Sequence, residues 1–118
     1  MAGLSLEPNI SDAHSQELVS RAQRGDADAA GQLYDRHSDA IFRYLWARLG
    51  DRLLAEDLTG EVFLRMLGAL ANYRALAVPF RAWLYRIARN LLVDQARKAG
   101  LRAALPLEAA ASTKYSRR

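Results

Sequence analysis

Residues 53–70 read LLAEDLTGEVFLRMLGAL, and residues 79–99 read PFRAWLYRIARNLLVDQARKA. In both stretches apolar side chains recur every three or four residues, which is the period of an amphipathic α-helix. Pro79 suits the first position of a helix, and Gly100 suits the position after its end. The stretches therefore predict two helices that bury Leu54, Leu58, Val62, Met66, Leu67 and Leu70 in the first and Phe80, Leu84, Ile87, Ala88 and Leu91 in the second.

Two further helices are predicted upstream, at about residues 15–24 and 27–49, because apolar residues show the same period there. Gly25 and Gly50 suit the ends of these helices, and Asp26 and Asp51 suit the N-caps of the helices that follow. The sequence thus predicts an all-α fold, a compact helical bundle of about four helices. We expect this domain to span residues 13–100, between a flexible segment at 1–12 and a linker start or tail at 101–118.

The composition limits the class of protein. A chain of 118 residues with 51% apolar and 25% charged side chains fits one globular domain. It contains no cysteine, so disulfides and thiolate metal sites are excluded. The N-terminus lacks the pattern of a signal peptide, and no apolar run reaches the length of a membrane span. We therefore expect a cytoplasmic protein without membrane insertion.

The charge is distributed unevenly along the chain. Residues 1–78 carry 8 arginines against 11 acidic residues, a net charge of −3, whereas residues 79–118 carry 9 basic residues against 2 acidic ones, a net charge of +7. A basic half of this kind favours contact with a polyanion such as nucleic acid. A solvated basic tail explains the charge equally well.

The predicted helix at 79–99 has a second face opposite its apolar one. Arg86, Arg89, Asn90 and Arg97 fall in one arc, with Trp83 at its border. Guanidinium groups one turn apart can follow successive phosphates, and an indole can stack on an unpaired base. Against this stand solvated arginines and a half-buried tryptophan. The pattern favours a DNA-binding face.

The break between the two stretches carries an amide, an aromatic ring and a guanidinium in a row, at Asn72, Tyr73 and Arg74. Such a set can hold a flipped base by stacking and by hydrogen bonds to its edge. A plain turn around a buried tyrosine is the alternative, and the sequence does not separate the two.

The helix at 53–70 has an acidic face, because Asp57 and Glu61 lie one turn apart, with Arg65 a further turn along. Spacing alone fits a solvated face with one ion pair. Phe63 and Leu64 flank this face, and if exposed they add an apolar contact for a basic protein partner.

The segments AEDLTGEVFLRML (55–67) and FRAWLYRIARNLLVDQARK (80–98) together resemble region 2 of extracytoplasmic-function (ECF) sigma factors of bacterial RNA polymerase. RAQRGDADAAGQLYDRHSDAIFRYL (21–45) is similar to the opening helices of that family, so the resemblance covers about residues 12–99. It implies a non-enzymatic domain that binds core polymerase and recognises and melts the −10 promoter element.

The resemblance also implies roles for particular residues. The first segment would bind the clamp helices of the largest polymerase subunit through Asp57, Glu61, Phe63, Leu64 and Arg65. The loop and last helix would bind promoter DNA through Asn72, Tyr73, Arg74, Trp83, Arg86, Arg89, Asn90, Arg97 and Lys98.

The chain departs from the family pattern in three places. Gly60 stands where many relatives carry glutamine, and the loop reads NYRALAVP in place of the form with Arg-Gly after the aromatic residue. The given sequence does not continue into region 4, the helix-turn-helix module that normally follows through a linker, so we expect either a truncated piece of a longer chain or a natural single-domain relative.

The sequence also bears on two other classes of function. A helical interaction module that mainly engages an anti-sigma regulator is the alternative to polymerase and DNA binding. An enzyme is disfavoured because His14 and His37 are isolated and no metal-ligand cluster, catalytic triad or phosphate-binding glycine loop is found. We expect no cofactor and no metal, and we expect His37 to be a helix-packing residue.

Overall fold

In the computed structural model, residues 12–74 and 77–104 are described, the last four without their side chains. They form α1 (Asp12–Gln23), α2 (Ala27–Leu49), α3 (Arg52–Ala69) and α4 (Phe80–Ala104), with a short 3₁₀ turn, η3 (Leu70–Asn72), directly after α3. Within these residues there is no strand. The predicted all-α bundle of four helices is confirmed. Most of the two predicted tails lies outside the described residues.

The turns between the first three helices follow local rules. Gly25 and Gly50 take positive φ angles of 96° and 69°, which glycine adopts without strain. Asp26 and Asp51 then cap α2 and α3, each side chain accepting a hydrogen bond from a backbone N–H three residues on, at 3.1 and 3.0 Å. Both predicted caps are confirmed.

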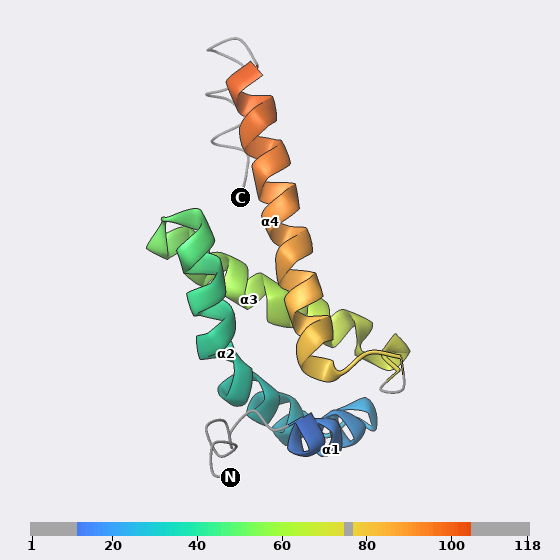
Figure 1. The fold of residues 1–118 in the computed structure, drawn as a ribbon. Coiled ribbons are helices and arrows are strands. Elements are labelled where there is room, and N and C mark those ends of the chain that lie inside the picture. Colours follow the sequence, from blue (N-terminus) through green and yellow to red (C-terminus); the bar gives the residue numbers. More distant parts are fainter. Residues whose placement is uncertain (1–11, 75–76, 105–118) are drawn as a thin grey trace.

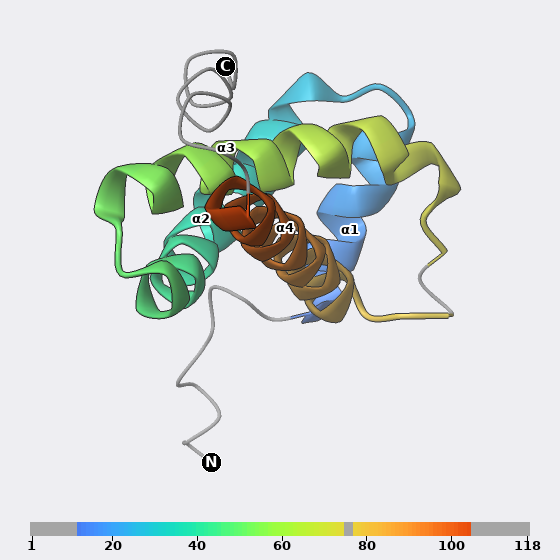
Figure 2. The same ribbon diagram turned by 90° about the horizontal axis from the view of Figure 1, so that it is seen from above.

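The helices cross one another and do not run in parallel. α3 packs against α2 on one side and α4 on the other, and α1 packs mainly against α2. The C-terminal half of α4 extends beyond the other three helices (Figure 1). Viewed from above, α3 passes across α4, and α2 and α1 lie on the two sides of α4 (Figure 2). The α4 surface is therefore open to solvent over much of its length.

The core lies where the four helices meet. Its largest fully buried apolar side chains are Phe80, Leu18, Leu33, Ile41, Leu45, Met66, Leu84 and Val62. His37 is buried among them at 3% exposure. Its Nε2 lies 2.9 Å from the Ser15 hydroxyl, and its ring meets the Phe80 ring edge-on at 5.3 Å. The packing role expected for His37 is therefore what the structure shows, since it joins α1, α2 and α4.

The end of α4 differs from the prediction. Gly100 was expected to end the helix, but α4 continues through it to Ala104. A glycine ends a helix when it takes the left-handed conformation, and Gly25 and Gly50 are the glycines that do so in the described residues. Within a run of good helix formers, a glycine costs only about 1 kcal/mol relative to alanine. The helix therefore continues.

The register of α3 also differs. Phe63, expected on the exposed side, is 5% exposed, whereas Leu67, expected in the core, is 51% exposed. The buried row instead comprises Ala55, Thr59, Val62, Phe63 and Met66. Apolar side chains occupy more than one side of α3, so periodicity alone did not identify the side that faces the bundle.

Candidate nucleic-acid and protein interfaces

The arginine face of α4 consists of Arg86, Arg89, Asn90 and Arg97. All four side chains are exposed, and Val93, which lies among them on the helix surface, is 47% exposed. Phe80, Leu84, Ala88 and Leu91 fill the opposite side and are buried. The packing of α4 therefore fixes these four polar groups toward solvent along about three turns of helix. Such a row of donors matches a phosphate backbone.

Arg97 and Lys98 are adjacent on α4 but lie in different environments. Arg97 stays on the arginine face, where its guanidinium lies 3.4 Å from the Asp94 carboxylate in an exposed pair of little energetic weight. Lys98, to which the resemblance gave the same DNA-binding role, instead lines a groove between α3 and α4. The structure thus does not bring Lys98 together with the three arginines.

Trp83 and Tyr73 stack on each other at the N-terminal end of α4. Their ring centroids are 4.6 Å apart at an interplanar angle of 27°. Tyr73 is 5% exposed, and Trp83 is half-buried and also touches the Phe80 ring. Tyr73 therefore belongs to the core, and the alternative of a buried tyrosine in a turn is what the structure shows. The neighbouring Asn72 and Arg74 are exposed.

The hydroxyl of Tyr73 connects the two ends of the loop between η3 and α4. It donates a hydrogen bond to the Val78 carbonyl and accepts one, at 2.9 Å, from the amide of Gln16 on α1. Burial raises the pKa of this hydroxyl above its ordinary value, with Asp12 adding to the rise and the bond from Gln16 opposing it. The hydroxyl stays protonated and remains a donor.

The outer face of α3 consists of Leu53, Asp57, Gly60 and Leu64, with Leu67 at its edge. Leu53 and Leu64 are 71% and 65% exposed. Sequence reasoning identified Asp57 and Leu64 but missed Leu53 and Leu67. A second row of leucines at helical spacing was the available signal. An exposed row of leucines beside a carboxylate is typical of a protein contact.

Glu61 and Arg65 lie toward α4. The Arg65 guanidinium is 3.5 Å from the Glu61 carboxylate and 3.8 Å from that of Asp94 on α4. These residues and Asp57 line the same groove as Lys98, which has a volume of about 420 Å³. The predicted acidic face is thus divided, because Asp57 borders both the outer face and the groove while Glu61 and Arg65 connect α3 to α4.

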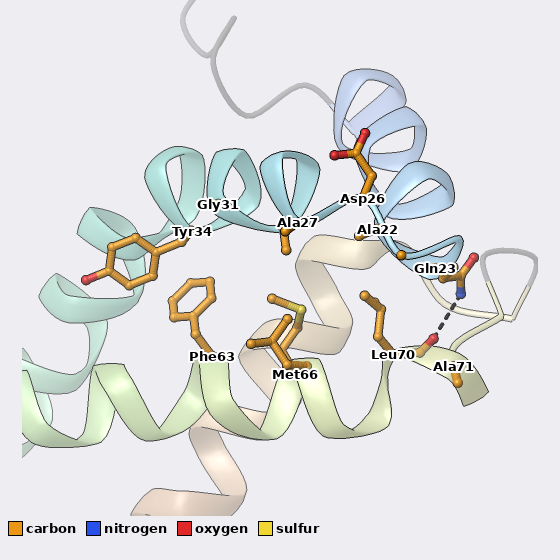
Figure 3. Close-up of a pocket in the computed structure, with 13 residues that line it drawn as sticks. Ala22, Gln23, Asp26, Ala27, Gly31, Tyr34, Phe63, Met66, Leu70 and Ala71 are labelled. Carbon is orange, nitrogen blue, oxygen red and sulfur yellow. Dashed lines mark hydrogen bonds between the residues drawn. The ribbon is translucent and has the colours of Figure 1, made fainter.

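A second, more apolar groove lies between the N-terminal half of α2 and the C-terminal half of α3 (Figure 3). Its volume is about 590 Å³. Phe63 forms part of its wall and meets the ring of Tyr34 edge-on at 4.9 Å. Gln23 stands at one end of the groove, bonded to the Leu70 carbonyl at 2.9 Å. The Phe63 side chain thus fills the space between two helices and is not part of the outer face of α3.

Within residues 12–74 and 77–104, no group of three or more His, Asp or Glu side chains is arranged to hold a metal ion. In the same residues no helix is long and apolar enough to cross a membrane.

A model of the Sigma-70 region 2 family matches residues 33–102, which include most of α2 and the helices that carry both candidate faces. The chain belongs to the Sigma-70 region 2 family. This sigma region 2 is 50% identical over 82 residues to the ECF RNA polymerase sigma factor BldN of Streptomyces coelicolor, covering 70% of this chain and 31% of BldN. It is 37% identical over 84 residues to SigL of Mycobacterium tuberculosis, covering 71% of this chain and 48% of SigL.

Another ECF sigma factor, SigW of Bacillus subtilis, is 34% identical over 85 residues, with 70% of this chain and 44% of SigW covered. Among solved structures, the RsbN–BldN complex contains a chain that is 44% identical, with a TM-score of 0.62, covering 74% of this chain and 64% of that one. These comparisons confirm the resemblance to ECF sigma region 2. The chain spans between about a third and a half of the length of these curated relatives.

Proposed function

We propose that this domain helps to place RNA polymerase on promoter DNA, with the outer face of α3 on the polymerase and the arginine face of α4 on the −10 element. The observation that carries the proposal is the separation of these two faces. They lie on different helices and share no residue, so the two partners would contact different side chains. The family membership and the ECF relatives support the same role.

The polymerase contact is proposed for the outer face because its leucines and Asp57 offer an apolar surface with a carboxylate at its border. A coiled-coil clamp with basic side chains would match this surface. Leu64 is one of the two most exposed leucines of this face, whereas Phe63 next to it is buried on the side of α3 that packs against the bundle. Glu61 and Arg65 contribute to the polymerase contact from the wall of the groove between α3 and α4.

The DNA contact is proposed for the arginine face, together with Asn72 and Arg74 at the mouth of the loop. Promoter melting requires binding of an unpaired strand, and such binding combines phosphate contacts with contacts to exposed bases. The arginines supply the first kind of contact, and Asn72 and Arg74 have the donor geometry for the second. The stack of the buried Tyr73 on the half-buried Trp83 supports this end of the loop.

The proposal assigns no catalytic step and no cofactor to the domain. Its site of action would be the cytoplasm, where bacterial polymerase and DNA are found.

The proposed DNA contact is tested with a pool of single-stranded oligonucleotides with a randomised centre. The pool is titrated against the chain by fluorescence anisotropy at several salt concentrations. Replacing Arg86, Arg89 and Arg97 together by alanine removes up to three phosphate contacts. The slope of log K against log salt should then fall in magnitude by about 2. Arg43→Ala on α2, also an exposed arginine, is the matched control and should leave the slope unchanged. Unchanged binding by the triple variant would refute the DNA face.

The polymerase arm is tested by binding of a recombinant clamp-helix fragment. Leu64→Asp should abolish binding, because a carboxylate in the centre of an apolar contact is desolvated without a partner. Val93→Asp places the same change on the exposed side of α4 and should leave clamp binding intact. Equal losses in the two variants would argue against the outer face as the contact.

A second candidate function is the binding of an anti-sigma regulator, favoured by the solved complex of the relative BldN with RsbN. An RsbN-like protein that binds this chain and excludes the clamp-helix fragment would support this role. Simultaneous binding of both would show that the regulator does not act by masking the outer face.

A further inference from the structure

Helix α1 has no part in either proposed interface, yet two of its side chains reach the loop that precedes α4. Gln16 and Gln23 lie on the side of α1 that faces η3 and the start of α4. Both side-chain amides donate hydrogen bonds to residues of η3 and the loop. No local sequence signal identified them, because their partners are 47 to 57 residues away in the chain.

Gln23 fastens the start of the loop. Its Nε2 donates to the Leu70 carbonyl at 2.9 Å and to the Tyr73 carbonyl at 3.1 Å. Carbonyls at the C-terminal end of a helix lack partners within the helix, so a side chain from another helix can satisfy them. Figure 3 shows this contact at the end of the apolar groove. One amide group thereby fixes the direction in which η3 ends.

The Tyr73 carbonyl also accepts a hydrogen bond from Arg74 Nη1 at 3.3 Å, and the same nitrogen lies 3.2 Å from the Ala71 carbonyl. Gln23 and the exposed guanidinium of Arg74 therefore share an acceptor. The position of Arg74, one of the proposed base-reading groups, depends on where Gln23 holds that carbonyl.

Gln16 fastens the end of the loop through Tyr73. Its amide donates to the Tyr73 hydroxyl at 2.9 Å, and that hydroxyl donates in turn to the Val78 carbonyl. The Tyr73 ring is clamped against Trp83 on α4. The two ends of the loop are thus held together by a chain of hydrogen bonds that begins on α1.

We propose that Gln16 and Gln23 are positioning residues for promoter recognition, which hold Asn72 and Arg74 in the arrangement that selects among bases. This inference rests on the proposed function, since it concerns the same DNA contact. The glutamines touch no DNA themselves. Their loss should therefore reduce the preference for particular sequences more than it reduces binding to DNA in general.

The hydrogen-bond chain is tested first without DNA, by amide hydrogen exchange. In Gln23→Leu, and in Gln23→Glu, which keeps the size of the side chain but removes its donors, both hydrogen bonds of the Gln23 amide are lost. The Tyr73, Ala77 and Val78 amides should then exchange at least about fivefold faster, the change expected from one lost hydrogen bond alone. Amides of α2 should be unaffected. Gln32→Leu, an exposed glutamine on α2, is the matched control. Unchanged exchange of the three loop amides would overturn the proposal.

A mutant cycle isolates Gln16. Gln16→Leu should speed exchange of the Val78 amide in the wild-type chain but have no further effect in the Tyr73→Phe background, where the hydroxyl is gone. Equal effects of Gln16→Leu in both backgrounds would show that Gln16 acts by packing and would overturn its positioning role.

The DNA readout uses the randomised single-stranded pool, with the bound fraction sequenced. For the Gln16→Leu, Gln23→Leu double variant, enrichment of the preferred sequences should fall about five- to tenfold, while total binding and its salt slope stay as in the wild type. A uniform loss of binding to all sequences, or unchanged enrichment, would overturn the proposal. If the wild type enriches no sequence, the proposed function fails instead, and the exchange experiment still decides whether the glutamines hold the loop.

Discussion

His37 should make the stability of this domain depend on pH below neutrality. Burial lowers its pKa from 6.5 to about 4, with Arg36 and Arg81 adding to the decrease and Asp12 opposing it. The ring is 3% exposed, bonded to Ser15 and packed on Phe80, so a second proton would place a charge in the core.

The sign and size of the effect follow from these two pKa values. As the pH falls below 6.5 the unfolded chain binds a proton at His37 before the folded chain does, which favours unfolding. The contribution of neutral His37 to the free energy of unfolding is complete above pH 6.5 and is lost by about pH 4. Since one pKa unit corresponds to 1.36 kcal/mol, the loss amounts to about 3 kcal/mol. For a domain of this size this is a large share of the total stability.

The assay is urea unfolding followed by circular dichroism, on the wild type and on His37→Gln, at a series of pH values between 7 and 4. The glutamine can still bond to Ser15 but does not titrate, and the carboxylates common to both proteins cancel in the difference. The free energy of unfolding of the wild type relative to the variant should fall by about 3 kcal/mol as the pH falls through this window. A difference that stays flat would refute the claim that His37 is held neutral.

Three further predictions concern α3 and are measured by urea unfolding at neutral pH. Phe63→Ala should lower the free energy of unfolding by about 3–5 kcal/mol because it leaves a cavity at a buried site. Leu64→Ala, at the neighbouring exposed position, should change the free energy of unfolding by less than about 0.5 kcal/mol. Similar losses in the two variants would contradict the observed register of α3. Gly60→Ala should raise the free energy by about 0.5–1 kcal/mol, since a Cβ there meets open space and the residue is helical, and a decrease would indicate a strained backbone. Asp51→Ala should lower it by about 1 kcal/mol through loss of the N-cap, and Asp51→Asn, which keeps an acceptor, should restore most of it.

The sequence alone located the four helices of this fold, apart from the C-terminal end of α4, because a helix depends on residues close together in the chain. Helical periodicity located four helices, and the pairs Gly25–Asp26 and Gly50–Asp51 marked two turns that the structure confirms. The exposure of Arg86, Arg89, Asn90 and Arg97 followed from the same periodicity, since α4 has one strongly apolar side. The family was also identified from linear motifs.

Only the tertiary structure decided which side of each helix meets a neighbour. Phe63 and Leu64 are adjacent and both apolar, yet one fills the space between α2 and α3 and the other faces solvent. Tyr73 is buried because Gln16 and Trp83, from two other helices, enclose it. Periodicity shows that a helix has an apolar side. Where two sides of a helix are apolar, as in α3, or where contacting residues lie far apart in the chain, as Gln16 and Tyr73 do, only the packing of the whole chain determines which side chains remain free to bind a partner.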